Sequence, residues 1–284
     1  MRPALPRQSY ASGRAPRAPA DDILEQQPEQ IAERAADVGA ERLERTWFDI
    51  FVTGVIGGVE VSLGGLAAMN VLGALLKAAP GLGLDGALAA AGMVFPAGFL
   101  FVILGRSELF TENFLIPVVA VLTRQRNVRS LLMLWALSLV GNLLGAALLA
   151  LLLLVPHAIG DQIRLGYGAY SSYKLALPGP ALFASACLAG IVMTVLTWLV
   201  IAVSNPVAKV LVIFAAGYTL FATNLSHVVV SGAIIFVGYH NTGHTILDVG
   251  RWIGIATAGN VAGGVGFVTF FRLAQAWEKN RQAV

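Results

Sequence analysis

One histidine lies inside an apolar stretch of the chain and is the side chain best suited to polar chemistry there. His227 follows the polar run 223–226 and precedes three valines at 228–230. An imidazole can donate a hydrogen bond to an anion, or give it a proton, near neutral pH. Ionisable residues within membrane helices usually serve function. His227 is therefore the first candidate site residue; the alternative is a buried histidine that only bonds a neighbouring helix.

Two pairs of side chains have spacings that could support catalysis or metal binding. His227 and Ser231 are four residues apart and share a helix face, as a base and a nucleophile would. No Gly-x-Ser-x-Gly turn accompanies them, so we predict no enzyme activity. His240 and His244 lie in a loop between apolar stretches, where only Asp248 is near enough in sequence to be a third ligand. We expect no metal and no cofactor.

The composition is that of an integral membrane protein. Of 284 residues, 57% are hydrophobic and 12% charged, and the mean hydropathy is +0.74. Soluble domains carry about 25% charged residues. The net charge of +3 is too small to indicate a nucleic-acid partner. The single cysteine, Cys187, excludes an intrachain disulfide framework and a thiolate zinc site.

The apolar stretches are long enough to cross a bilayer, which takes about 20 residues per helix. Six are expected, near residues 47–76, 86–121, 128–155, 178–203, 207–238 and 249–276. Six crossings leave both termini on one face. The excess of Lys and Arg in the loops on that face predicts that it is cytoplasmic, in the inner cell membrane.

Three regions follow from this pattern. Residues 1–46 form a cytoplasmic N-terminal tail, residues 47–276 the transmembrane channel domain, and residues 277–284 a cytoplasmic C-terminal tail. Within the first tail, the spacing of apolar residues from 28 to 46 indicates a short amphipathic helix at the membrane surface or against the channel mouth. A partly helical solvated tail is the alternative.

The second and fifth spans are interrupted by polar residues. The second contains Gly-Arg-Ser-Glu-Leu-Phe-Thr-Glu-Asn at 105–113, and the fifth contains Thr-Asn-Leu-Ser-His at 223–227. Paired broken helices point to a transport site, because polar backbone at such depth survives only beside protein or a cavity. Gly-Asn motifs at Asn142 and Asn260 are 118 positions apart, as are Leu109 and His227. Three spans repeated by three spans predict an inverted repeat.

Four segments together resemble the formate–nitrite transporter family. They are GRSELFTENFL at 105–115, VGNLLGA at 140–146, NLSHVVVSG at 224–232 and GNVAGG at 259–264. The resemblance covers most of the chain. It implies an all-α, aquaporin-like membrane fold of six transmembrane helices in an inverted 3+3 repeat, with helices 2 and 5 broken. It also implies a homopentamer with one anion pathway through each protomer.

The resemblance also implies roles for particular residues. His227 would lie at the middle of the pore, and Thr111, in the break of helix two, would face it. Lys174, in the loop leading to helix four, would raise the local potential for anions; because its spacing to helix four is longer than in the family pattern, a solvated loop lysine is the alternative. The constriction residues carried over by position are Phe95, Phe99, Leu109, Phe110 and Leu220.

Three positions depart from the family pattern and bear on the substrate. Ser226 stands where many relatives carry Glu, Ser231 where the usual residue is Asn, and Glu60 in the middle of helix one, where relatives are usually apolar. A carboxylate at such depth costs about 2.5–3.5 kcal/mol unless it is paired or faces a cavity. We therefore expect Glu60 in or beside the pathway, paired with Arg106 or His227, or protonated.

The remaining motif residues are expected to be structural. Arg106, Glu108 and Glu112 cluster around the break of helix two and are predicted to pin it through an ion pair. Asn142 and Asn260 can bond the carbonyls of the broken helices, and the small residues around them let helices approach closely.

The sequence thus predicts a membrane channel or transporter for small monovalent anions of weak acids. His227 would donate a proton or a hydrogen bond, and protons and the lipid bilayer are the other expected partners. A channel for a small neutral solute, aquaporin-like, is the alternative, because Ser226 and Ser231 make the pathway less charged than usual.

Overall fold

The computed structural model describes residues 26–282, with side chains to residue 278, and every regular element in that part of the chain is a helix. The predicted tails up to residue 25 and after residue 282 lie outside the described residues. In chain order the elements are α1 (Pro28–Glu44), α2 (Trp47–Ala78), η2 (Pro80–Leu82), α3 (Gly83–Ala91), α4 (Pro96–Gly105), η3 (Phe110–Phe114), α5 (Ile116–Leu122), α6 (Val128–Leu153), α7 (Asp161–Leu175), α8 (Gly179–Ala202), α9 (Pro206–Ala222), α10 (Val228–Gly238), η4 (Tyr239–Asn241), α11 (Ile246–Val261), the π-helical η5 (Ala262–Thr269) and α12 (Phe270–Gln282).

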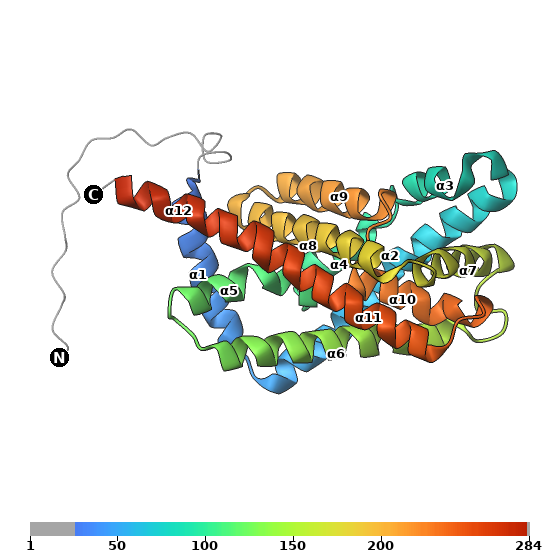
Figure 1. Ribbon diagram of the computed structural model, residues 1–284, viewed down its shortest axis with the longest axis horizontal. Coiled ribbons are helices and arrows are strands. Elements are labelled where there is room, and N and C mark those ends of the chain that lie inside the picture. The colour runs from blue at the N-terminus through green and yellow to red at the C-terminus, as the bar shows by residue number, and fades with distance from the viewer. Residues whose placement is uncertain (1–25, 283–284) are drawn as a thin grey trace, which may run out of the picture.

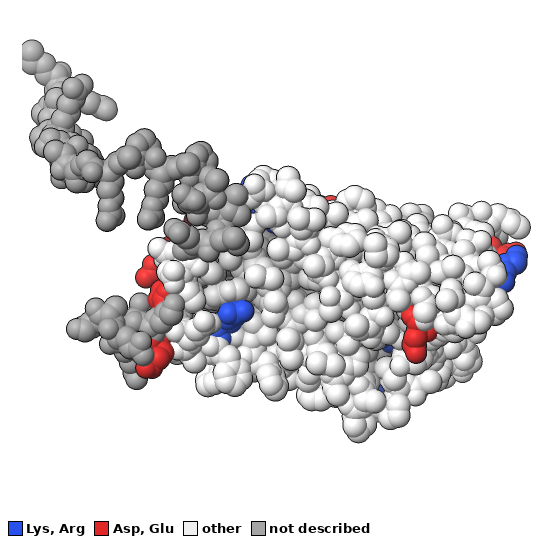
Figure 2. All heavy atoms as spheres, turned by 90° about the horizontal axis from the view of Figure 1, so that it is seen from above, with Lys and Arg blue, Asp and Glu red and all other residues white. Residues whose placement is uncertain are grey.

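Five helical segments of the described chain are long and apolar enough to cross a membrane. They are α2, the segment Pro80–Gly105 that contains α3 and α4, α6, α8 and the segment Ile246–Glu278 from α11 into α12. The predicted fifth span consists of two shorter apolar helices, α9 and α10. Figure 2 shows a wide band without charged side chains between the charged ends of the molecule, as a lipid-facing belt requires.

Each break contains one residue with a left-handed backbone. Arg106 directly follows α4, Asn224 lies two residues after the end of α9, and their φ angles are 59° and 54°. Asparagine tolerates this conformation well, whereas an arginine there is unusual. Arg106 and Asn224 are 118 positions apart, the same offset that relates Asn142 to Asn260.

The helix pairs flanking the breaks also repeat. Helix α2 packs against α6 through Gly58, which lies against the carbonyl of Asn142. Helix α8 packs against α11 through Gly190, which lies against the carbonyl of Asn260. A Cβ at either glycine would collide with that backbone, so glycine is required at both crossings. The contacts confirm the inverted repeat.

Each half also has a helix that the predicted spans did not include. Helix α1 packs on α5, and Gly39 lies against the carbonyl of Ile116. Helix α7 packs on α10, and the Ser171 hydroxyl donates to the carbonyl of Ile234, 3.4 Å away. Gly39 and Ser171 are 132 positions apart, and Ile116 and Ile234 are 118 positions apart. Helices α1 and α7 are thus repeat counterparts, and Figure 1 shows them at opposite ends of the bundle.

Candidate functional site

The centre of the site is a hydrogen bond between the two broken helices. The hydroxyl Oγ1 of Thr111, in η3, lies 2.7 Å from Nε2 of His227, the N-cap residue of α10. Both side chains are fully buried. The prediction that Thr111 faces His227 is confirmed.

A second contact assigns the proton on the imidazole. Nδ1 of His227 accepts a hydrogen bond from the backbone N–H of Val230 at 3.0 Å, which is an N-cap contact. An accepting Nδ1 carries no proton, so in the neutral ring the proton is on Nε2. Nε2–H is therefore a donor, with the oxygen of Thr111 as its acceptor. His227 itself is the N-cap residue of α10.

A column of rings leads away from His227 toward α7. Phe99 lies 6.1 Å from the imidazole and 5.0 Å from Phe95, between ring centroids. Phe95 stacks on Phe221 at 4.7 Å, and Phe221 on Tyr170 at 5.8 Å. The predicted constriction residues Phe95 and Phe99 lie in this column.

Lys174 lies beside Tyr170, the last ring of that column, and beside the second break. Its Nζ donates to the carbonyl of Asn224 at 2.5 Å and to Oγ of Ser226 at 3.4 Å, and it lies 5.3 Å from the centroid of the Tyr170 ring. The side chain is fully buried, and no described acidic group pairs with it. The predicted loop position is wrong: Lys174 lies in the last turn of α7, because the stretch 161–175 is amphipathic enough to form a helix.

Ser231 positions this column. Its Oγ lies 2.8 Å from the phenolic oxygen of Tyr170. The sequence indicated Ser231 as a pathway residue, and the structure brings it to the end of the ring stack.

The opposite side of the Thr111–His227 pair carries a different set of charges. Glu108 is buried and forms ion pairs with Arg42, near the end of α1, and with Arg45, which follows it. The amide of Asn113 donates to the same carboxylate at 2.7 Å. An ion pair does pin this break, but the arginines come from the N-terminal helix, whereas Arg106 was the expected partner.

The two predicted structural asparagines tie each break to its neighbours. Asn142 donates to the carbonyls of Gly54 and Glu108 and accepts from the N–H of Phe110, each at 2.8 Å. Asn260 donates to the carbonyls of Ala186 and Ser226 at 2.8 and 3.0 Å. It accepts from the N–H of Val228 at 2.9 Å. The same three bonds occur in both halves.

The other predicted constriction residues are buried in the same core cluster as Phe95 and Phe99; they are Leu109, Phe110 and Leu220. The Phe110 ring lies 5.0 Å from Phe114 and 6.5 Å from Trp135.

Glu60 does not join these groups. It lines a shallow apolar hollow on the outside of α2 and α4, and its Oε2 is shielded without a hydrogen-bond partner. Neither expected pairing, with Arg106 or with His227, forms among the described residues.

Sequence reasoning missed four residues of the site. Tyr170 and Phe221 extend the ring column, and Arg42 and Arg45 hold the first break. The sequence did contain one signal for Arg42. It lies 132 positions before Lys174, the offset that relates α1 to α7, but that relation is visible only once α7 is known to be a helix.

These features define a class of protein. Two halves built as an inverted repeat, each with a broken helix whose break meets the other at a buried polar pair, form a polytopic membrane protein of the channel and transporter kind. A sequence model described as formate/nitrite transporter matches residues 29–274. The chain belongs to the formate/nitrite transporter family.

Individual relatives agree. The chain is 28% identical to the formate channel BtFdhC of Bacillus thuringiensis over 254 residues, covering 86% of this chain and 93% of the relative. A solved FNT family ion channel superposes with a TM-score of 0.74 at 22% identity, covering 86% of this chain and 98% of that one. A pentameric formate channel with formate bound superposes with a TM-score of 0.61 at 18% identity, covering 80% and 96%. The fold class expected from the sequence is confirmed.

Proposed function

We propose that this protein conducts formate and similar small monovalent anions of weak acids across the inner cell membrane. The observation that carries the proposal is the donor at the centre: Nε2–H of His227, at the meeting point of the two broken helices. Similarity to proteins described as formate channels supports formate as the substrate.

The histidine acts by hydrogen bonding, and the geometry explains why. With Nδ1 accepting from Val230, the ring holds one proton, on Nε2. Giving that proton away would leave an imidazolate, which is far too basic to form near neutral pH. The anion therefore takes the place of the Thr111 oxygen as acceptor of Nε2–H. The Thr111 hydroxyl is then free to donate a second hydrogen bond to the same anion.

The surroundings favour an anion that sheds its water. The buried rings of Phe95 and Phe99 offer no hydrogen bonds, so an entering ion loses hydration that His227 and Thr111 replace. The buried side chain of Lys174 lies beside Tyr170 and the second break, and burial lowers its pKa to about 7; its protonated form attracts negative charge. An assembly of five copies, with both termini in the cytoplasm, is part of this proposal.

The test is formate flux into proteoliposomes, compared between wild type and two variants. His227→Asn keeps an acceptor for the Val230 N–H, because asparagine is a good N-cap residue, but cannot reach Thr111. His227→Gln places an amide N–H near the position of Nε2. We expect flux about 10–100-fold lower in His227→Asn, as for the loss of a hydrogen bond to a charged group, and a smaller loss in His227→Gln.

Each outcome is decisive. If His227→Asn conducts formate at the wild-type rate, the histidine mechanism is rejected and the channel function is kept. Flux of glycerol or water without formate flux would replace the anion channel by a neutral-solute channel.

A further inference from the structure

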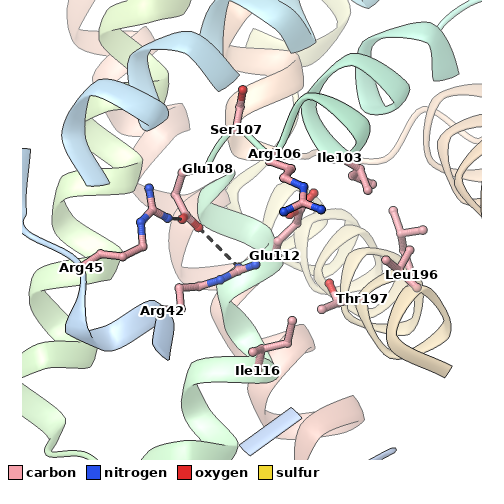
Figure 3. A pocket seen from close by; sticks show the side chains of 11 residues that line it. Arg42, Arg45, Ile103, Arg106, Ser107, Glu108, Glu112, Ile116, Leu196 and Thr197 are labelled. Carbon is pink, nitrogen blue, oxygen red and sulfur yellow. Dashed lines mark hydrogen bonds and ion pairs between the residues drawn. The ribbon is translucent and has the colours of Figure 1, made fainter. Parts of the chain in front are cut away.

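A pocket opens beside the first break, at the end of the bundle capped by α1. Its volume is about 270 Å³. Arginine and glutamate side chains dominate its polar lining: Arg42, Arg45, Arg106, Glu108 and Glu112. Figure 3 shows these side chains converging from α1, from the junction after it and from the break of helix two.

Glu108 is already compensated within this pocket. It pairs with Arg45 and Arg42 and accepts from the amide of Asn113. Arg45 also bonds Asp49 at 2.6 Å. Burial opposes the charge of Arg45, but its hydrogen bond to Asp49 and the charge of Glu108 outweigh that effect and raise the pKa of Arg45. The charges of this cluster therefore nearly cancel, and its side chains form one wall of the pocket.

Arg106 and Glu112 form the other wall, and neither side chain has a hydrogen-bond or ion-pair partner among the described residues. No described residue hydrogen-bonds or ion-pairs with the Arg106 side chain, which is solvent-exposed. The Oε1 atom of Glu112 is shielded from solvent and has no hydrogen-bond partner. Both side chains line the pocket, and Figure 3 shows them in the same part of it. A shielded carboxylate oxygen without a donor is costly when the group is ionised, so this arrangement favours the neutral acid.

We propose that this pocket is a proton-dependent subsite for a small carboxylate, in which Arg106 binds the anion and the protonated Glu112 donates a hydrogen bond to it. The inference rests on the proposed function and adds a site to it. An arginine and a neutral carboxylic acid together satisfy both oxygens of a carboxylate, whereas an ionised Glu112 repels it.

Glu112 keeps its proton, because ionising this shielded carboxyl is costly, and the bound carboxylate moves on toward Thr111 as an anion. The charged groups facing Glu112 are Arg42, Arg45, Arg106 and Glu108. Helix α8 adds only the uncharged Leu196, Thr197 and Val200 to the pocket, and α5 only Ile116.

The transport test compares formate flux from about pH 5 to about pH 8 in wild type, Glu112→Gln and Arg106→Gln. Glutamine keeps a donor and removes titration, so Glu112→Gln should lose the pH dependence of flux. Arg106→Gln should raise KM for formate about tenfold, because it removes a charged hydrogen-bond donor. Glu41→Gln on α1 and Arg129→Gln on α6 are exposed controls and should behave as wild type.

A binding test separates this proposal from the proposed function. Because Arg106 is exposed, phenylglyoxal should modify it, and sodium formate should protect it more at low pH than at high pH in wild type but not in Glu112→Gln. The proposal is overturned by a wild-type pH profile in Glu112→Gln, by an unchanged KM in Arg106→Gln, or by absent protection. Protection without flux would leave the subsite and reject the channel. If either glutamine variant fails to fold, Arg106→Lys and Glu112→Asp take its place, with smaller shifts in the same direction.

Discussion

The two broken helices share one scaffold and carry different chemistry. At the scaffold positions the halves agree: Asn142 matches Asn260 in all three hydrogen bonds, and Arg106 matches Asn224 in its left-handed backbone. The halves differ at two pairs of corresponding positions in the breaks. Glu108, held by arginines, corresponds to the neutral Ser226, and the apolar Leu109 corresponds to His227.

The difference extends to the helices that cap the two ends. Arg42 of α1 and Lys174 of α7 are counterparts, yet Arg42 pairs with a carboxylate, whereas Lys174 meets only a carbonyl and a hydroxyl. The cation of α1 is thus paired with a carboxylate, whereas its counterpart in α7 has no described carboxylate partner. The symmetric positions hold the fold, and the charged side chains are what differ between the halves.

The largest expected effect comes from removing the shared scaffold. Asn142→Leu and Asn260→Leu each leave two carbonyls and one N–H without a partner, and each unpaired buried group costs about 1–3 kcal/mol. We expect both variants to lose roughly 3–6 kcal/mol of unfolding free energy. Denaturant titration of the purified protein in detergent micelles measures this loss.

The match between the two halves also predicts that the two asparagine variants lose similar amounts of unfolding free energy. Because the two asparagines make matching bonds, their losses should agree within about 1 kcal/mol. Asn241→Leu, at an exposed position of η4 whose side chain makes no described hydrogen bond, is the control and should change stability by less than about 0.5 kcal/mol. A large loss in one half only would show that the halves are not equivalent in energy.

Much of this scaffold could be read from the sequence. Polar residues interrupting apolar stretches located both breaks, and the Gly-Asn motifs located the asparagines, because these features are local in the chain. Helix α7 was missed since its amphipathic stretch lacks the continuous apolarity of a span. The pairing of Glu108 with Arg42 and Arg45 was missed for another reason: these residues lie more than 60 positions apart, and nothing local joins them.

The site was also only partly predictable. The contact of Thr111 with His227 followed from the repeat and the family resemblance. The tautomer of His227 did not, because it depends on one backbone N–H at hydrogen-bonding distance. The position of Glu60 depends on which face of α2 turns outward, and glycines on several faces of that helix obscure its apolar period.

Replacing Lys174 and Arg42, the two cations of α7 and α1, should have smaller and unequal effects on flux. Lys174→Met preserves the length of the side chain and removes a charge that no described carboxylate balances. We expect formate flux about tenfold lower, a loss of roughly 1.4 kcal/mol in the pathway. Arg42→Met should lower flux less than about threefold, because Arg45 still holds Glu108. Stopped-flow measurement on matched proteoliposomes gives both values.

Lys77→Met is the control for this pair. Lys77 lies exposed in the last turn of α2, the helix that packs against α7, and its loss should leave flux unchanged. Equal losses in Lys174→Met and Arg42→Met would show that the carboxylate of Glu108 does not cancel its arginines. The asymmetry inferred from the contacts would then be wrong.

The smallest effect is expected at Glu60, where the two halves differ outside the pathway. Its counterpart at an offset of 132 is Val192, on the outside of α8. Glu60→Val therefore gives the first half the residue of the second. Removing a carboxyl with an unpartnered Oε2 should stabilise the protein by about 1 kcal/mol and leave formate flux within about twofold.

Flux and assembly together identify what Glu60 does. A clear fall in flux with the oligomer intact would return Glu60 to the pathway, where the sequence placed it. Dissociation of the oligomer, seen by native mass spectrometry, would instead mean that the missing donor of Oε2 comes from a neighbouring subunit. Unchanged flux and assembly, with higher stability, is the result that the outward-facing hollow on α2 and α4 predicts, because nothing described there donates to the carboxylate.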